Sequence, residues 1–428
     1  MNESKFVIVG GGMVAGYAAK QLVELGLKSG ELTILSAETS APYERPPLSK
    51  GFLAGRDTEE SIRINPDEFY RKQGIELKLG CSVTRVDPKN KRLSLQPGGE
   101  FRFEKLIVAT GSRVRTLDIP GAALANVRYL RSLDDSKAIR HCAESVKQAV
   151  VIGSGFIGME VAAILAQKGP QVVMVVRDDR VWKQFFSPPM SQFFETYYTA
   201  RGVRFVKGAT VKELRGDRTV SSVVLGNGQM IACQLVVAGI GVRPATDWLA
   251  NSGIEVSDGV VVNEYLETNT PGIFAAGDLA NYQDVLFDKR RRVEHWDNAV
   301  SQGQHCARAL VGKREPFKHV PYFFSDVFDL SYEFWGDPSG ANDIIHRGDL
   351  SSNSFSVWWL REKVVVAAFV MNRPNEERDV APKWIESKQR VSNAMLANAS
   401  HAILAAVEAD GRSSPVENQE ANATTYRS

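Results

Sequence analysis

One hydrophobic pattern occurs twice along the chain. Residues 6–9 are a short β-branched and aromatic run, a glycine-rich turn follows at 10–16, and an amphipathic stretch continues through 17–22. An apolar run at 32–35 completes a strand–helix–strand order, and the same order recurs at 149–176. Because one such unit does not serve two dinucleotides, the pattern predicts two nucleotide-binding domains.

Shorter patterns predict further strands. Alternating runs at 75–79 and 92–95 are typical of short antiparallel strands. Residues 270–278 predict another strand that ends in a glycine turn. The expected fold class is α/β, with two Rossmann-like dinucleotide-binding domains and a C-terminal α+β domain.

The character of the chain changes from about residue 321, where Phe and Trp become dense. Residues 355–360 and 364–370 predict a hairpin, and a helix is expected after Pro382. From Asp410 onward the residues are small and polar without periodicity, which predicts a disordered tail.

Composition narrows the class of protein. The 428 residues are 43% hydrophobic and 24% charged, which excludes a mostly disordered chain and suggests about three domains. The net charge of +2 argues against a nucleic-acid binder that relies on a strong positive field. No apolar run approaches the ~18 residues that span a bilayer, and the strand-like run from Phe6 leaves no room for a signal peptide. We therefore expect a soluble cytoplasmic protein.

The cysteines predict little covalent or metal chemistry. Cys81, Cys142, Cys233 and Cys306 lie far apart, and none forms a Cys-x-x-Cys pair. We expect neither a disulfide framework nor a metal site.

The first glycine turn has the spacing of a dinucleotide site. Gly10 suits the tight turn, Gly12 allows close approach of a pyrophosphate, and Ala15 lets the helix pack against the strand. Glu38, after the second strand, is expected to meet the adenosine ribose; the alternative is a purely structural turn. The expected contacts of this turn are Gly10, Gly12, Met13, Val14, Ala15 and Gly16.

The second turn carries all three glycines, at Gly153, Gly155 and Gly158. Asp178, after its second strand, is suited to the ribose hydroxyl of NADH, whereas Arg177 is suited to the 2′-phosphate of NADPH. A solvated charged turn is the alternative. Cofactor preference stays open, with NADH favoured.

Further motifs carry a family resemblance. The chain has a Glu-Lys-Leu-Ile-Val-Ala-Thr-Gly run at 104–111, a Gly-Ile-Gly-Val-Arg-Pro run at 239–244 and a Gly-Asp pair at 277–278. With the two turns, these resemble flavoprotein pyridine-nucleotide reductases. The resemblance implies a split FAD domain at 1–115 and 246–320, an inserted NAD(P) domain at 116–245 and a C-terminal interface domain at 321–408. The tail that composition predicts as disordered then occupies 409–428.

Two features select a branch of these reductases. There is no cysteine before Cys81, which excludes a flavin-adjacent disulfide there, and a Pro-Tyr-Glu-Arg-Pro-Pro-Leu-Ser-Lys run stands at 42–50. This run resembles the group of ferredoxin reductases, monodehydroascorbate reductases and apoptosis-inducing factor. The resemblance places Lys50 beside the isoalloxazine, paired with Glu160, so that the pair sets the local charge as a hydride arrives.

The resemblance implies further site residues. Arg45 lies along the adenine and phosphate side, Asp278 bonds the ribityl chain, and Gly241 lies near the nicotinamide. Trp296 and Trp335 resemble tryptophans that flank the flavin in bacterial ferredoxin reductases, and with Lys50 and Glu160 they are the expected catalytic residues. The remaining implied cofactor contacts are Val83, Thr110, Gly111, Arg131, Phe156, Ile157, Glu294 and His295.

Three functional hypotheses follow from the resemblance. The first is a reductase that passes hydride from NAD(P)H to FAD and single electrons to a ferredoxin-type iron–sulfur protein. The second is a monodehydroascorbate reductase, although Val300 and Phe324 stand where that family has Arg and Tyr for its substrate. The third is a redox-responsive interaction protein that resembles apoptosis-inducing factor. Each is compatible with a monomer or a homodimer.

One basic run has two interpretations. Residues 289–292 read Lys-Arg-Arg-Arg. Such a run could dock an acidic carrier protein, or it could be a solvated loop.

Overall fold

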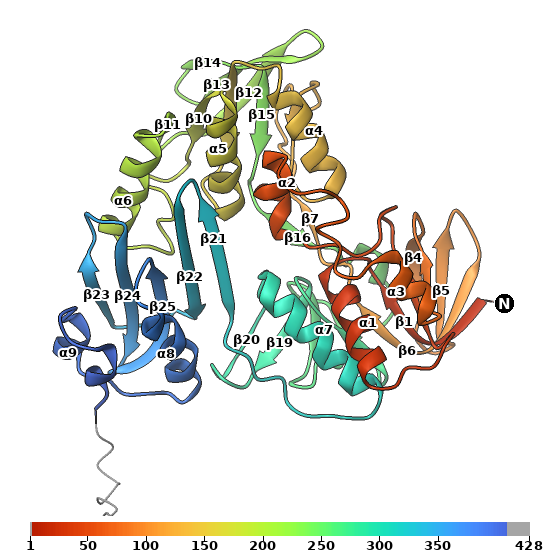
Figure 1. Cartoon of the computed structure of the whole chain (residues 1–428). Helices are drawn as coiled ribbons and strands as arrows, with labels where there is room; N and C mark the ends of the chain where they lie inside the picture. Colours follow the sequence, from red (N-terminus) through yellow and green to blue (C-terminus); the bar gives the residue numbers. More distant parts are fainter. Residues whose placement is uncertain (1, 409–428) are drawn as a thin grey trace, which may run out of the picture.

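The computed structural model describes residues 2–408, which form three units (Figure 1). The tail expected at 409–428 lies outside the described residues. The N-terminal unit contains a mixed sheet in the order β3-β2-β1-β6-β5-β4, with β18 paired to β6. Its strands are β1 (Asn2–Val9), β2 (Leu32–Leu35), β3 (Glu76–Lys78), β4 (Ser82–Asp87), β5 (Arg92–Gln96), β6 (Glu100–Val108) and β18 (Ile273–Ala275).

The first strand–helix–strand unit is confirmed. Strand β1 pairs in parallel with β2, and α1 (Met13–Glu24) connects them. Helix α1 lies beside α7 (Trp296–Leu310), although the two helices are far apart in the sequence (Figure 1). The unit also contains η1 (Pro46–Ser49), α2 (Gly51–Ala54), α3 (Asp67–Lys72), η2 (Asp247–Leu249), β17 (Val260–Val262), β19 (Ala280–Asp284) and β20 (Lys289–Arg291).

The prediction of antiparallel strands is half right. Strand β5 is antiparallel to β4 and β6, as expected. Strand β3 is parallel to β2, so the antiparallel prediction for 75–79 is wrong. The reason is the connection, since α3 lies between β2 and β3 and returns the chain to the same end of the sheet.

The central unit confirms the second strand–helix–strand unit. Its parallel sheet has the order β11-β10-β9-β15-β8, and α5 connects β9 to β10. A separate antiparallel sheet, β12-β13-β14, covers one side, and β7 pairs with β16 where the chain passes between the units. Its elements are β7 (Ser112–Val114), β8 (Val127–Arg128), α4 (Leu133–Ala143), β9 (Gln148–Ile152), α5 (Phe156–Lys168), β10 (Gln171–Val175), α6 (Pro188–Thr199), β11 (Val203–Val206), β12 (Val211–Gly216), β13 (Val220–Leu225), β14 (Met230–Ala232), β15 (Leu235–Ala238) and β16 (Val242–Pro244).

The C-terminal unit is an antiparallel sheet in the order β21-β22-β25-β24-β23. The predicted hairpin is confirmed, since β24 pairs with β25. Its elements are β21 (Tyr322–Val327), β22 (Leu330–Gly336), β23 (Asp343–Asp349), β24 (Ser354–Arg361), β25 (Val364–Met371), α8 (Asn375–Glu386), α9 (Asn393–Ala397) and η3 (Ile403–Ala406).

The helix expected after Pro382 begins earlier, because Pro382 lies inside α8. Proline lacks the N–H that would donate to the carbonyl four residues back. Its local preference is therefore for the first turn of a helix, which is why the sequence predicts a helix start here. Packing overrides this local preference: Val380, Ala381, Trp384 and Ile385 lie on one face and are buried in the core of this unit.

One hydrophobic core joins the central and C-terminal units. Phe194 of α6 packs edge-on against Tyr332 of β22 and Phe369 of β25, with ring centroids 5.4 and 6.4 Å apart. All three belong to a continuous buried cluster, whereas β1, α1 and α7 have their own. Within residues 2–408, no helix combines the length and apolar character that crossing a membrane requires.

Candidate active site

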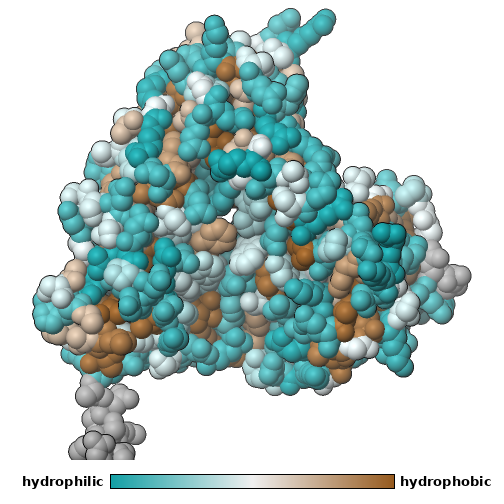
Figure 2. All heavy atoms as spheres, in the orientation of Figure 1, coloured by the Kyte–Doolittle hydropathy of each residue, from teal (hydrophilic) through white to brown (hydrophobic). Residues whose placement is uncertain are grey.

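A cleft of about 1120 Å³ opens where the three units meet. The face drawn in Figure 2 is mostly hydrophilic at its edges and hollowed at this junction. The glycine turns that begin α1 and α5 both line this cleft. The other predicted residues that line it are Met13, Val14, Glu38, Arg45, Lys50, Val83, Thr110, Gly111, Arg131, Phe156, Ile157, Glu160, Gly241, Asp278, Glu294, His295 and Trp296.

The first glycine turn requires its glycines. Gly10 has φ +121°, and a Cβ there would lie 2.1 Å from the carbonyl oxygen of Ala109. Gly12 caps α1 without a side-chain hydrogen bond, so the first-turn N–H groups are left to the cleft. A helix N-terminus of this kind attracts a pyrophosphate.

The second turn repeats this arrangement. Gly153 has φ +100°, and a Cβ on it would lie 2.2 Å from the oxygen of Gly239. A Cβ on Gly158 would lie 2.3 Å from the Gly153 oxygen, so the helix and the strand approach closely. A Cβ on Gly155, the N-cap of α5, would meet nothing within 4 Å, because this residue faces the cleft.

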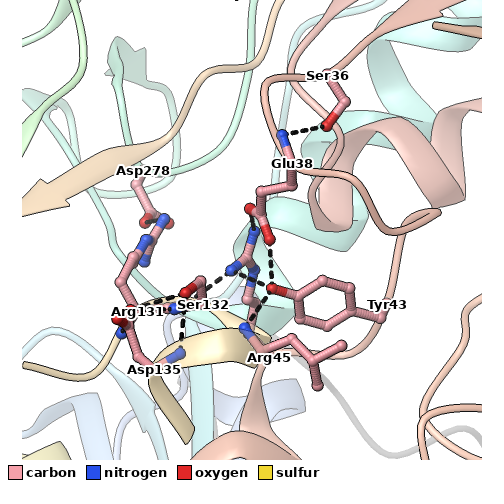
Figure 3. Close-up of polar contacts among 9 residues, drawn as sticks. Ser36, Glu38, Tyr43, Arg45, Arg131, Ser132, Asp135 and Asp278 are labelled. Atoms are coloured by element: carbon pink, nitrogen blue, oxygen red, sulfur yellow. Dashed lines mark hydrogen bonds and ion pairs between the residues drawn. The ribbon is translucent and has the colours of Figure 1, made fainter. Parts of the chain in front are cut away.

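Glu38 is held by two partners at the end of the first repeat. Its carboxylate accepts 2.5 Å from the Tyr43 hydroxyl and forms an ion pair with Arg45 (Figure 3). The Tyr43 hydroxyl also accepts from Arg45 at 2.8 Å and from the Leu133 N–H at 2.9 Å. Burial raises the pKa of Tyr43 far above its ordinary value, so it stays a neutral donor to Glu38.

Arg131 extends the polar wall toward Asp278. Its guanidinium pairs with the Asp278 carboxylate at 2.9 Å (Figure 3). The residue is oriented by the start of α4, where Asp135 accepts from the N–H groups of Arg131 and Ser132 at 3.0 and 2.8 Å. The wall thus presents two guanidinium groups beside the first glycine turn, a composition suited to phosphate.

Lys50 and Glu160 form a buried ion pair across two units. Lys50 Nζ lies 2.6 Å from Glu160 Oε1, and their side chains are 14% and 4% exposed. Ser325 Oγ donates to the same carboxylate oxygen at 2.5 Å, and Ser49 Oγ donates to Oε2. Both oxygens of the carboxylate therefore have donors, which is the condition under which a buried charge is tolerated.

The N-terminus of α7 supplies an aromatic wall. Trp296 donates 2.5 Å from Nε1 to Glu44 and contacts Phe324 edge-on, with centroids 6.2 Å apart. His295 packs edge-on against Phe323. Burial, aided by the charge of Arg291, lowers the pKa of His295 to about 4, so it is neutral at pH 7.

Five predicted site residues do not line this cleft. Ala15 is fully buried in the core, and a Cβ on Gly16 would lie 2.7 Å from Ile64. A Cβ on Gly153 would meet the Gly239 oxygen, so all three residues serve close packing. The carbonyl of Asp178 accepts from Gly208 N–H in the turn after β10. Trp335 packs against Tyr322 with the rings tilted and their centroids 5.3 Å apart, and it lines a smaller cavity of about 410 Å³.

The loop interpretation of the basic run is wrong, whereas docking of an acidic carrier protein stays a prediction. Residues 289–291 form strand β20, not a loop, and the cations face acids or carbonyls of the protein. Arg291 pairs with Asp284 and, at 2.7 Å, with Asp337; Lys289 also pairs with Asp337. Arg290 donates to backbone carbonyls, and Arg292 pairs with Glu294 and Asp258. The acidic partners offset part of the positive charge of this run, but Arg290 contacts only carbonyls and is exposed.

Several residues that contact the site belong to motifs of the sequence, although the motifs alone do not single them out. Tyr43 and Ser49 belong to the run at 42–50, and Phe323, Phe324 and Ser325 belong to the aromatic run after 321. Their position in these runs indicates that they lie near the site. Only the fold shows which of them contact Glu38 or Glu160. Ser36, Cys81 and Phe185 line the cleft without any motif.

Two glycine turns that face one cleft, with a lysine–glutamate pair between them, define a flavin- and nicotinamide-dependent reductase. Residues 4–303 match the family described as Pyridine nucleotide-disulphide oxidoreductase, and residues 322–407 match Reductase C-terminal. The chain belongs to the pyridine nucleotide-disulphide oxidoreductase family. Its cofactors are FAD and NAD(P)H, and its four cysteines are all free, so it has no redox-active disulfide.

Relatives fall into two named classes. The chain is 35% identical to peroxisomal monodehydroascorbate reductase 4 of Arabidopsis thaliana, over 90% of this chain and 83% of that protein. It is 33% identical to the probable ferredoxin reductase CtmF of Castellaniella defragrans, over 87% and 92% of the two chains.

Solved structures give the same fold. A putidaredoxin reductase–putidaredoxin complex matches with a TM-score of 0.91 and 32% identity, over 96% of this chain and 100% of that chain. The ferredoxin reductase for the CYP199A2 system of Rhodopseudomonas palustris matches with a TM-score of 0.90 and 31% identity, over 95% and 100%.

Proposed function

We propose that this reductase delivers electrons from NAD(P)H, through FAD, to a ferredoxin-type iron–sulfur protein. FAD supplies the step from hydride acceptance to single-electron release. Its pyrophosphate would lie at Gly12 with Arg45 and Arg131 nearby, and that of NAD(P)H would lie at Gly155. We propose NADH as the preferred donor, because Asp178 follows the second strand of its domain.

The observation that carries the proposal is the apolar wall of the cleft beside Lys50. Phe324 lies 5.5 Å from Lys50 Nζ and contacts Trp296 edge-on. Val300, one turn along α7 from Trp296, packs into the hydrophobic core. Phe324, Trp296 and Val300 themselves offer no cation or hydroxyl to a small anionic, oxygen-rich substrate. Such a wall suits electron transfer to a partner protein. The solved complex of putidaredoxin reductase with putidaredoxin supports a partner of this class.

Monodehydroascorbate reduction is the second candidate, favoured by the 35% identity to the Arabidopsis enzyme. An interaction protein similar to apoptosis-inducing factor is a third hypothesis. It predicts a stable complex with NADH and a change in oligomer size in place of turnover. The first two candidates differ in the acceptor, not in the reaction with NAD(P)H, whereas the third has no acceptor turnover.

Parallel measurements of NADH oxidation separate the candidates. The acceptors are a [2Fe–2S] ferredoxin of the putidaredoxin type, ascorbyl radical and ferricyanide. We expect turnover with the ferredoxin and with ferricyanide. Rapid ascorbyl turnover without any ferredoxin reduction would support the second candidate and exclude the first.

A further inference from the structure

The Glu160 carboxylate is held by side chains from both of the other units. Lys50 and Ser49 approach it from the N-terminal unit, and Ser325 approaches it from strand β21 of the C-terminal unit. Figure 1 shows the β21–β22 hairpin reaching from the C-terminal sheet to the side of α5, the helix that carries Glu160.

Ser325 is placed behind the ion pair. Lys50, Ser49 and Glu160 line the cleft, but Ser325 does not, and its side chain is 1% exposed. Its register partner is the buried Tyr332 of β22, so the hydroxyl is fixed by the pairing of two strands. It therefore has no direct access to a cofactor in the cleft.

Ser325 and Lys50 donate to the same carboxylate oxygen of Glu160. The Ser325 hydroxyl lies 2.5 Å from Glu160 Oε1, the same atom that Lys50 Nζ approaches at 2.6 Å. A hydroxyl that donates to a buried carboxylate both orients it and compensates part of its charge. Loss of this donor would leave Oε1 with Lys50 alone, and only Ser49, on Oε2, would then orient the carboxylate besides the lysine.

We infer that Ser325 is a positioning residue for flavin reduction, because it holds the Glu160 carboxylate in the orientation that pairs with Lys50. Through this contact the C-terminal unit influences the reaction with NAD(P)H. This role is independent of the electron acceptor, because flavin reduction precedes electron delivery. The ferredoxin proposal and this inference therefore fail separately.

The test uses the FAD-loaded protein and two readouts. Ser325→Ala is expected to lower the limiting rate of flavin reduction by NADH about tenfold, the factor associated with a hydrogen bond to a charged group. The apparent affinity for NADH is expected to stay unchanged, since Ser325 is outside the cleft. The midpoint potential of the bound FAD, measured by spectroelectrochemistry without NADH, is expected to become more negative, because a less compensated carboxylate opposes added electrons.

A matched control separates this role from general stability. Ser356 lies on β24 of the same sheet as Ser325 and is also buried. Its hydroxyl donates a 2.5 Å hydrogen bond to the buried carboxylate of Glu377 on α8. Ser356→Ala is expected to lower the melting temperature while leaving the reduction rate and the potential unchanged. Equal rates and potentials in Ser325→Ala and the wild type would overturn the inference.

A shape-matched pair covers the case in which Ser325→Ala does not fold. Ser325→Thr keeps the hydroxyl and Ser325→Val has the same shape without it. We expect Thr to retain the rate within about twofold and Val to lose about tenfold. Equal behaviour of the Thr and Val variants would contradict the inference.

Discussion

The indole N–H of Trp296 donates a 2.5 Å hydrogen bond to the carboxylate of Glu44, a residue 252 positions earlier in the chain. The other carboxylate oxygen of Glu44 accepts 2.6 Å from the hydroxyl of Tyr17 on α1. The tryptophan at the edge of the cleft is thus tied to the N-terminal unit by a carboxylate with two neutral donors.

This contact predicts a selective defect in electron delivery. Glu44→Leu removes the acceptor and frees the indole, so we expect reduction of a [2Fe–2S] ferredoxin to slow severalfold while flavin reduction by NADH is unchanged. Tyr17→Phe is the control, because it removes the second donor without touching Trp296. Stopped-flow measurement of the two half-reactions distinguishes them, and equal slowing of both would contradict the role of Trp296.

The Lys50–Glu160 pair predicts a non-additive effect on stability. Lys50→Met leaves a buried carboxylate without its cation and is expected to cost about 3 kcal/mol of unfolding free energy. Adding Glu160→Met removes the orphaned charge and should recover most of that loss. Urea unfolding of the two single variants and the double variant measures the coupling, and simple addition of the two losses would contradict it. Flavin reduction by NADH should be impaired in all three variants.

The second glycine turn predicts that two neighbouring glycines respond differently to alanine. Gly155→Ala places a methyl group in the open cleft, so the melting temperature and the flavin content should stay unchanged. The KM for NADH should rise about tenfold, because the methyl group blocks approach to the helix N-terminus. Gly153→Ala must displace the Gly239 carbonyl at a positive φ, so this variant should lose stability. A normal KM for NADH in Gly155→Ala would argue against a pyrophosphate at this turn.

His305 predicts a loss of stability in mild acid. Burial lowers its pKa from the ordinary 6.5 to about 4, and its side chain is 3% exposed. Between these two values His305 binds a proton in the unfolded chain but not in the folded chain. The free energy of unfolding therefore has its full value above about pH 6.5 and falls as the pH drops toward 4. The slope is at most about 1.4 kcal/mol per pH unit for one histidine.

The measurement is urea unfolding at pH 7.5 and at pH 5. His305→Leu should reduce the difference between the two unfolding free energies. His141→Leu is the control, because His141 is 88% exposed and its replacement should leave the difference unchanged. An unchanged difference in His305→Leu would show that other groups cause the loss.

Local geometry explains why much of the fold was predictable. The two glycine turns have positive φ and close backbone contacts that only glycine permits, so they are visible in the sequence at Gly10 and Gly153. The apolar runs around them become the buried parallel strands β1 and β9 for the same local reason.

Predictions were wrong where a distant partner decides the outcome. The direction of β3 depends on its pairing with β2, and alternation of residues does not encode that direction. Helix α8 includes Pro382 because Trp384 and Ile385 gain burial against a sheet formed elsewhere in the chain. The basic run forms a strand rather than a solvated loop, and Asp337, from the C-terminal unit, reaches Lys289 and Arg291.

Residues that are close together in the chain establish the class of protein: two dinucleotide turns, a lysine in the run at 42–50 and no cysteine pair near it are typical of a reductase without a disulfide relay. The surroundings of the Lys50–Glu160 pair depend instead on contacts between distant segments. The tertiary structure places Trp296 on the cleft and Trp335 away from it, and it brings Ser325 to Glu160. The physical reason is range: turn conformation is set by neighbours in the chain, whereas the partners of a buried charge come from whichever segments pack together.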